Sequence, residues 1–188
     1  MNIDEMKELL IPSISKNRYS HTLGVVETAK VLASLHGADV LKAEKAALLH
    51  DCAKGMSEKD MLTVCAEENF PPDEFEKEAL PVLHAPAGAA LSKKLYGIHD
   101  PEILNAIRSH TIGCLNPSKL DAIIFVADFI EPGRRPFEGL EHVRRLSRTN
   151  LLSALKECAR LSGDYVKSNG GQMHPTTIKM INDTEELT

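Results

Sequence analysis

The sequence predicts an all-α protein, a single-domain bundle of helices. Apolar residues recur at helical spacing along most of the chain, and no stretch shows the strict alternation expected of a half-buried strand. Residues that commonly cap helices precede several of these stretches. The 188 residues contain no internal repeat, low-complexity tract or linker, so one domain spanning residues 1–188 is expected.

Four helices are expected in the first part of the chain, each with an apolar face. They cover residues 4 to 16, 18 to 36, 39 to 50 and 57 to 65. Pro12 should kink or break the first of them, and Gly37 stands at a natural C-cap position after the second. Asp39 should cap the third, and Ser57, followed three residues later by Asp60, should cap the fourth.

The second part of the chain follows the same pattern. Further helices are expected at residues 85 to 96, 100 to 110, 120 to 130 and 150 to 167, with a last short helix after Pro175. Pro81 and Pro86 should bracket a separate short segment that holds His84. The sequence Asp100-Pro101-Glu102 is typical of a helix start, because proline and acidic residues suit the first turn.

Composition and charge exclude several classes of function. No apolar run approaches the roughly 20 residues that span a bilayer, and the acidic start of the chain shows no signal-peptide pattern, so a cytoplasmic protein without membrane association is expected. The net charge is −5 and no Lys/Arg tract is long, which argues against a nucleic-acid polymer as partner. The four scattered cysteines are expected to be reduced and mostly buried.

An adjacent histidine and aspartate end the apolar run Ala46-Ala47-Leu48-Leu49. Because burying an unpaired carboxylate is costly, Asp51 needs a cation, a metal or a good set of hydrogen bonds. The same argument applies to Asp128, which directly follows the apolar run Ile123-Ile124-Phe125-Val126-Ala127. These two acids indicate a site at which several helices converge.

Four of the eight histidines lie in or beside apolar helical segments near a helix boundary: His21, His50, His84 and His110. Histidine nitrogens combined with carboxylate oxygens suit Fe, Mn, Co or Zn. His21 and Asp128 are the best candidates to complete a coordination sphere around His50-Asp51. Any one of these residues alone is better explained as a hydrogen-bonded core residue, but together they favour a metal site.

Three cations fit an anionic ligand near such a site. Arg18 lies three residues before His21, on roughly the same helical face, and Lys54 lies four residues after His50. Arg134 follows the helix that carries Asp128. Arginine offers phosphate a two-pronged donor and lysine a point charge.

The ordered set His21, His50-Asp51, His84, His110 and Asp128 resembles the HD superfamily of metal-dependent phosphohydrolases. Longer blocks are similar to the YqeK family within it, and the similarity runs from about residue 18 to residue 178. The blocks are Arg18 to Val25, Leu48 to Lys54, Ala106 to Thr111, Ala127 to Arg134 and His174 to Ile178.

The resemblance implies an HD-type helical fold and symmetrical hydrolysis of diadenosine tetraphosphate, or a related dinucleoside polyphosphate, to two ADP- or GDP-type products. It implies iron as the metal, with Mn, Co or Zn as alternatives, and a homodimer. The implied metal ligands are His21, His50, Asp51 and Asp128. The implied catalytic residues are Asp51, His84 and His110. The implied substrate-binding residues are Arg18, His21, Asp51, Lys54, His84, His110, Thr111, Asp128, Arg134, Met173 and Thr176. Met173 stands where a branched aliphatic residue is usual in the family.

Alternatives stay open from the sequence. The chain is otherwise expected to be another HD nucleotide phosphohydrolase, such as a nucleotidase, a dNTP hydrolase or an alarmone hydrolase, or a nucleotide-binding regulatory module without catalysis. One tightly held metal is favoured, with His84 and His110 facing phosphate. The alternative is that these two histidines belong to a second, weaker metal site.

Overall fold

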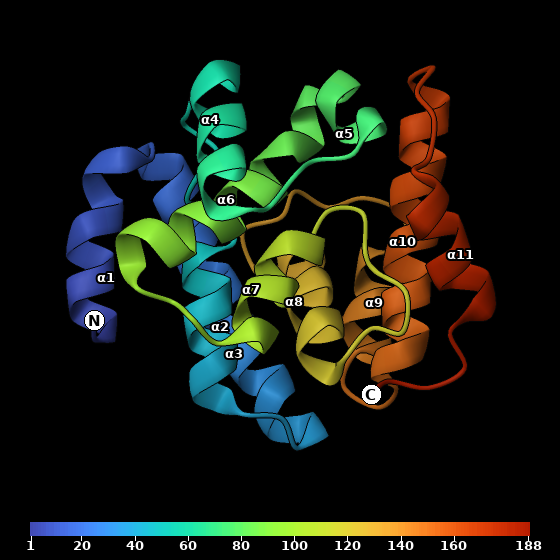
Figure 1. Cartoon of the computed structure of the whole chain (residues 1–188). Coiled ribbons are helices and arrows are strands. Elements are labelled where there is room, and N and C mark those ends of the chain that lie inside the picture. The colour runs from blue at the N-terminus through green and yellow to red at the C-terminus, as the bar shows by residue number, and fades with distance from the viewer.

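The computed structural model describes every residue from Met1 to Thr188, and its regular structure is entirely helical (Figure 1). Eleven α-helices and one short 3-10 helix follow one another along the chain. They are α1 (Ile3–Leu10), η1 (Ile11–Ser13), α2 (Lys16–His36), α3 (Val40–Leu49), α4 (Glu58–Glu68), α5 (Glu74–Glu78), α6 (Leu80–Tyr96), α7 (Pro101–Ser109), α8 (Lys119–Ile130), α9 (Leu140–Leu146), α10 (Leu151–Ser168) and α11 (Pro175–Asp183). The all-α prediction is confirmed.

Side-chain caps start the helices near the predicted places. Asp39 accepts two backbone N–H bonds at the start of α3, at 2.8 and 3.0 Å. Ser57 caps α4 and Asp100 caps α7 in the same way. Each cap satisfies donors that the first helical turn leaves unpaired. Gly37 ends α2 in the left-handed region, with φ 67°, which a residue without Cβ adopts at little cost.

Two boundaries at the start of the chain are placed differently. The first helix ends at Leu10, and Pro12 lies in η1, so the proline breaks the helix. α2 starts at Lys16, two residues earlier than expected, because the Ser15 side chain accepts the N–H of Arg18 at 3.2 Å and caps the helix.

The prediction of a separate short segment around His84 was wrong. α6 runs without interruption from Leu80 to Tyr96 and includes Pro86, which was expected to mark a boundary. A proline inside a helix removes one backbone donor. Here the residues from Leu83 to Ala90 are all buried, and α6 packs against α4 and α7. Tertiary packing therefore offsets the lost hydrogen bond, and His84 is held within a rigid helix.

Two short helices were not predicted. α5 has five residues, too few to show helical periodicity, although Asp73 and Glu76 form a reciprocal capping box at its start. α9 begins after Gly139, which has φ 94° and offers no side-chain cap. α9 therefore has no start signal, and α5 is too short for an apolar face to follow its capping box.

α8 lies at the centre of the fold. It packs against α2, α3, α7, α9 and α10, and Figure 1 shows α7 and α8 in the middle of the bundle, with α1 and α11 on opposite sides. Residues 120 to 127 are all buried. A helix that is buried on every side has few places for an acid. Asp121 lies in the first turn, where it exchanges hydrogen bonds with Ser118, and Asp128, in the last turn, is the acid that the sequence singled out.

The bundle brings five helix ends together. His50 directly follows α3, and His110 directly follows α7. His21 lies in the second turn of α2, and His84 lies near the start of α6. With Asp128 near the end of α8, these positions place the polar side chains at one end of the apolar core.

No helix combines the length and the apolar character needed to cross a membrane. The four cysteines are free, and three of them, Cys52, Cys65 and Cys158, are buried. These thiols pack as small apolar side chains.

Candidate metal centre

Asp51 is the most highly connected residue of the site. It stands in the turn after α3, and only 2% of its side chain is exposed. Arg18 donates from Nη1 to Oδ2 at 2.6 Å, and Lys54 donates from Nζ to Oδ1 at 3.3 Å. Two cations from different elements therefore offset the charge of a buried carboxylate.

Two imidazoles and two carboxylates form a cluster that we call the candidate metal centre: His21, His50, Asp51 and Asp128. Nε2 of His21 lies 3.0 Å from Oδ1 of Asp128 and 3.8 Å from Oδ2 of Asp51. Nε2 of His50 lies 3.4 Å from Oδ2 of Asp51 and 3.9 Å from Oδ1 of Asp128. The two nitrogens therefore face the same two carboxylate oxygens.

The protonation of the imidazoles fits a metal. Nε2 of His21 and Nε2 of His50 are buried without a hydrogen-bond partner. Nδ1 of His50 lies 2.7 Å from the carbonyl oxygen of Ala47, which only accepts, so Nδ1 carries a proton and Nε2 is the nitrogen that can bind a metal when the ring is neutral. Buried lone pairs beside ionised carboxylates are the arrangement that a divalent cation satisfies. The nitrogen and oxygen donors suit Fe, Mn, Co or Zn better than Mg or Ca.

The other carboxylate oxygen of Asp51 meets a second pair of histidines. Oδ1 lies 3.1 Å from Nε2 of His84 and 3.6 Å from Nε2 of His110, and the two ring nitrogens are 3.1 Å apart. Nδ1 of His110 donates to the carbonyl of Ile107 at 2.7 Å. The ligand atoms of these three residues also lie close enough together to hold a cation. Asp51 thus links both halves of the site.

The two carboxyl groups are held in their ionised form. Burial by itself would raise the pKa of Asp51, but the charge of His50 and the hydrogen bonds of His110 outweigh it, and the pKa lies well below its usual range. Burial also opposes ionisation of Asp128, yet the adjacent ring of His21 and the charge of His50 keep that pKa low. Ionised carboxylates are the form that binds metals.

His84, by contrast, is held in its neutral form. Burial lowers the pKa of its imidazole to about 4, although the hydrogen bond to Asp51 opposes that change. The ring is therefore neutral at pH 7, with one nitrogen that donates and one that accepts.

Arg134 reaches Asp128 from the turn after α8. Its Nη2 lies 2.6 Å from Oδ1 of Asp128, and its Nε donates to the backbone carbonyl of the same residue at 2.9 Å. Asp128 is 22% exposed at its side chain, so the Arg134 side of the centre is the more open one. All three predicted cations thus contact the two carboxylates.

The remaining predicted substrate residues lie farther along the fold. Oγ1 of Thr111, directly after His110, is buried and has no hydrogen-bond partner. Met173 is half-buried against α10, where a Cβ on Gly163 would lie 2.2 Å from its Sδ. Thr176 lies in the first turn of α11 and lines a cavity of about 440 Å³. No hydrogen bond or ion pair joins Met173 or Thr176 to the candidate metal centre, so the structure leaves their predicted contacts untested.

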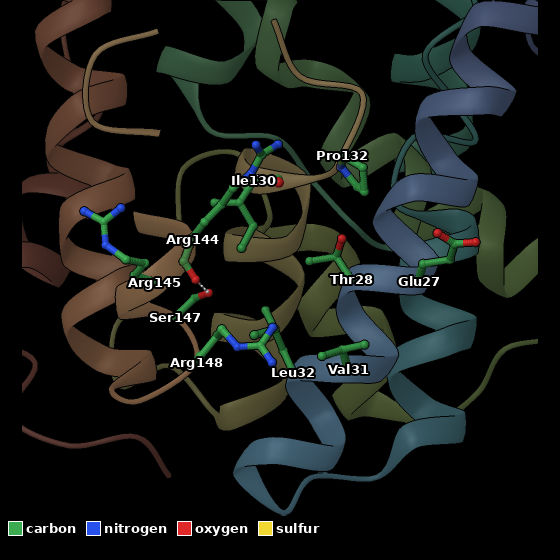
Figure 2. Close-up of a pocket in the computed structure, with 10 residues that line it drawn as sticks. All are labelled: Glu27, Thr28, Val31, Leu32, Ile130, Pro132, Arg144, Arg145, Ser147 and Arg148. Atoms are coloured by element: carbon green, nitrogen blue, oxygen red, sulfur yellow. Dashed lines mark hydrogen bonds between the residues drawn. The ribbon is translucent and has the colours of Figure 1, made fainter. Parts of the chain in front are cut away.

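Grooves flank α2 on the outer side of the centre. One, of about 480 Å³, is lined by His21, Gly24 and Glu131 among others. The neighbouring groove, of about 510 Å³, lies between α2 and α9 (Figure 2). Its lining residues are Glu27, Thr28, Val31, Leu32, Ile130, Pro132, Arg144, Arg145, Ser147 and Arg148. None of these ten belongs to the candidate metal centre.

One residue of the site escaped the sequence reasoning. Glu131 follows α8, is buried, and places Oε1 at 3.2 Å from Nδ1 of His21. The signal in the sequence is a second acid at the end of the apolar α8 stretch, directly before Pro132-Gly133. Glu131 lies within the block Ala127 to Arg134 that resembles the YqeK family, but the sequence predicted no role for it.

Three further histidines have surface or capping roles. His99 and His142 are exposed. Nε2 of His36 lies 2.6 Å from the carbonyl oxygen of Ser147, directly after α9, and so satisfies a carbonyl at that helix end.

Comparisons with known proteins match this site. Residues 18–133 match the HD domain family. The chain is 40% identical to the symmetrical bis(5'-nucleosyl)-tetraphosphatase of Halalkalibacterium halodurans, over 97% of this chain and 96% of that protein. It is 36% identical to the protein of the same name from Bacillus subtilis, over 97% of both chains.

A solved structure agrees with the fold. The crystal structure of an HD superfamily hydrolase from Clostridium acetobutylicum, described as involved in NAD metabolism, superposes with a TM-score of 0.91 at 36% identity. The match covers 97% of this chain and 96% of that one. Sequence, fold and the ordered histidines and aspartates thus agree over nearly the whole length. The chain belongs to the HD domain family and, within it, to the YqeK family.

Proposed function

We propose that this protein is a metal-dependent hydrolase that splits diadenosine tetraphosphate, and related dinucleoside polyphosphates, into two nucleoside diphosphates. One observation carries the proposal. Two histidines and two ionised aspartates converge in a buried cluster, within a chain that aligns along nearly its full length with symmetrical bis(5'-nucleosyl)-tetraphosphatases. We also propose that residues 1–188 form one domain.

His21, His50, Asp51 and Asp128 are the proposed metal ligands. The lone pairs on both Nε2 atoms and the low pKa of both carboxyls support this set. Iron is the proposed metal, since mixed nitrogen and oxygen donors suit it, and Mn, Co and Zn suit the same donors. When bound, such a metal acidifies water and polarises a phosphoryl oxygen.

The chemistry asks for positioning and charge neutralisation more than for covalent work. Water adds to one of the two central phosphorus atoms, and the bond from that phosphorus to the middle bridging oxygen breaks. One ADP leaves with the bridging oxygen, and the other keeps the oxygen from water. Attack at either central phosphorus yields the same two products, which explains symmetrical cleavage.

Asp51, His84 and His110 are the proposed catalytic residues. Asp51 contacts both pairs of histidines and so fixes their relative positions. His84 is neutral at pH 7, and its ring hydrogen-bonds to that of His110. These two rings are placed to donate to phosphate oxygens and to carry a proton to the leaving diphosphate.

A separate set of side chains is proposed to bind the substrate. Arg18, Lys54 and Arg134 gather positive charge in one place on a protein of net charge −5, which focuses the field on a polyanion. Other proposed contacts are His21, Asp51, His84, His110, Thr111 and Asp128. Met173 and Thr176 are proposed to contact the base.

The setting of the enzyme is part of the proposal. Free, mostly buried cysteines suit the reducing conditions of the cytoplasm, which is the proposed location. A homodimer is proposed from the family resemblance, and light scattering on the purified protein tests it.

Product analysis tests the proposed reaction. Purified protein is incubated with diadenosine tetraphosphate and one metal at a time, with ferrous iron handled under argon. We expect two ADP per substrate and neither ATP, AMP nor orthophosphate. In H₂¹⁸O, one label should enter the terminal phosphate of half of the ADP.

Other outcomes would contradict the proposal in recognisable ways. ATP plus AMP would mean asymmetric cleavage. Turnover of a nucleoside monophosphate, a dNTP or an alarmone with the dinucleotide left intact would mean another HD phosphohydrolase. Tight ADP binding without turnover under any metal would mean a regulatory nucleotide-binding module.

A further inference from the structure

Glu131 is a buried carboxylate that the proposed reaction does not use. Both of its oxygens have a partner: Oε1 lies 3.2 Å from Nδ1 of His21, and Oε2 accepts the backbone N–H of Gly133 at 2.5 Å. Only 4% of its side chain is exposed. A buried acid with defined partners on both oxygens is fixed in one orientation.

Two glycines, which lack a Cβ, leave space for this carboxylate. A Cβ on Gly24 of α2 would lie 2.5 Å from Oε2 of Glu131, closer than real Cβ contacts come. A Cβ on Gly133 would lie 3.0 Å from the same oxygen. Since neither glycine has a positive φ, clearance for Glu131 explains them better than backbone conformation does.

Arg144 holds the backbone that carries Glu131. From α9 it donates through Nε to the carbonyl of Ile130 at 3.0 Å and through Nη2 to the carbonyl of Glu131 at 2.8 Å. Figure 2 shows Arg144 beside Ile130 at the wall of the groove between α2 and α9. Arg144 also pairs with Glu141 at 2.7 Å. The end of α8 is thus capped by a guanidinium from another helix.

These contacts determine how His21 presents its ring. An ionised carboxylate only accepts, so Nδ1 of His21 carries the proton and donates to Glu131. Nε2 then keeps its lone pair and faces Asp128 at 3.0 Å. A carboxylate behind a metal-binding imidazole fixes its tautomer and orientation and makes it a better ligand.

We propose that Glu131 is a positioning residue for the metal centre, holding His21 with its Nε2 lone pair directed at the metal, and that Arg144 anchors the turn from which it acts. The inference rests on the proposed function in so far as His21 is a metal ligand. It adds two residues, Glu131 and Arg144, which act through His21 and touch neither metal nor substrate.

Metal affinity, measured without substrate, tests the inference. Co²⁺ is titrated into the metal-free protein against a chromophoric chelator, and the visible spectrum of the bound ion is recorded. Glu131→Ala should weaken Co²⁺ binding by about 10- to 100-fold, the usual cost of losing such a partner. Glu131→Gln should lose less, because its amide oxygen can still accept from His21. The matched control Glu27→Ala, an exposed acid two turns along α2, should bind as wild type does.

A second variant separates positioning from folding. Gly24→Ala keeps Glu131 but places a methyl carbon 2.5 Å from the present position of Oε2, so the carboxylate must move, and alanine favours helix more than glycine does. Gly24→Ala should therefore weaken Co²⁺ binding without lowering the helix propensity of α2. This variant decides the matter if Glu131→Ala does not fold.

The outcomes distinguish this inference from the proposed function. Wild-type affinity and an unchanged Co²⁺ spectrum in folded Glu131→Ala or Gly24→Ala would overturn the positioning role, whether or not the enzyme cleaves dinucleotides. A wild-type protein that binds metal but cleaves no dinucleotide would overturn the substrate and leave the positioning role intact. A wild-type protein that binds no divalent metal would overturn both.

Discussion

Asp51→Asn should empty the metal centre and abolish most of the activity, while the protein stays folded. Asparagine keeps the size of the side chain but removes the negative charge that both the metal and the cations Arg18 and Lys54 require. We expect metal content at or below roughly a tenth of the wild-type value. Turnover of diadenosine tetraphosphate should fall by about a thousandfold, as when a main charge-stabilising group is lost.

The measurement pairs metal analysis of the purified variant with product chromatography and far-UV circular dichroism. Asp164→Asn is the matched control, because Asp164 is an exposed acid on α10 that pairs only with Arg160. The control should retain metal and turnover. If Asp51→Asn kept normal metal content and normal turnover, the assignment of the centre would be wrong.

Arg108→Ala should cause the largest loss of stability among charged residues outside the site. Arg108 of α7 donates through both Nη atoms to Glu76 of α5, at 2.5 and 2.6 Å, and the Glu76 side chain is completely buried. The substitution leaves that carboxylate without its cation. Breaking a buried pair from one side costs about 3–5 kcal/mol, because the remaining charge is uncompensated.

Urea unfolding followed by circular dichroism gives the free energy of unfolding for the variant and its control. Arg160→Ala removes another two-pronged pair, to Glu157, but the Arg160 side chain is 52% exposed. Its loss should be no more than about 1 kcal/mol. Equal losses for the two variants would mean that burial of Glu76 does not determine the strength of its pair.

The pair also connects the fold to the site. Arg108 lies two residues before His110 at the end of α7, and Glu76 belongs to the short helix that the sequence did not predict. Since His174 bonds to Asp73 at the start of the same helix, α5 ties α7 to the start of α11. Loss of Arg108 should therefore loosen the start of α11, which carries Thr176.

Helix boundaries were predictable where a local signal marked them. Asp39 and Ser57 cap helices in the structure as expected, because N-capping depends only on a side chain and the next three residues. Pro86 was wrongly expected to mark a helix boundary, since whether a proline ends a helix depends on packing against α4 and α7, which no local pattern shows. α9 was missed because it is short and no side chain caps its start.

The chemistry of the site was predictable because burial makes charged residues conspicuous. Asp51 and Asp128 stand out inside apolar stretches, and the structure brings them to the same two imidazoles, His21 and His50. The sequence also indicated Arg18 as part of the site. It did not indicate that Arg18 pairs directly with Asp51, because α2 and α3 meet only in the folded chain.

Glu131 shows where sequence reasoning stops. Its position after an apolar helix suggests a terminator, and only the packing of α2 against the turn after α8 reveals its bond to His21. Gly24 and Gly133 could not be interpreted either, since glycine in a helix or a turn has many causes. Their meaning comes from the distance of a Cβ to Oε2 of Glu131.

Anomalous diffraction from crystals of the purified, metal-loaded protein tests whether His21, His50, Asp51 and Asp128 bind the metal. An absorption-edge scan identifies the metal, and the anomalous map locates it. We expect the metal to be iron. The strongest peak of the anomalous map should be enclosed by these four side chains, at roughly 2.0–2.2 Å from the ligand atoms. A strongest peak at any other place, such as between His84 and His110 with these four side chains uncoordinated, would contradict this assignment.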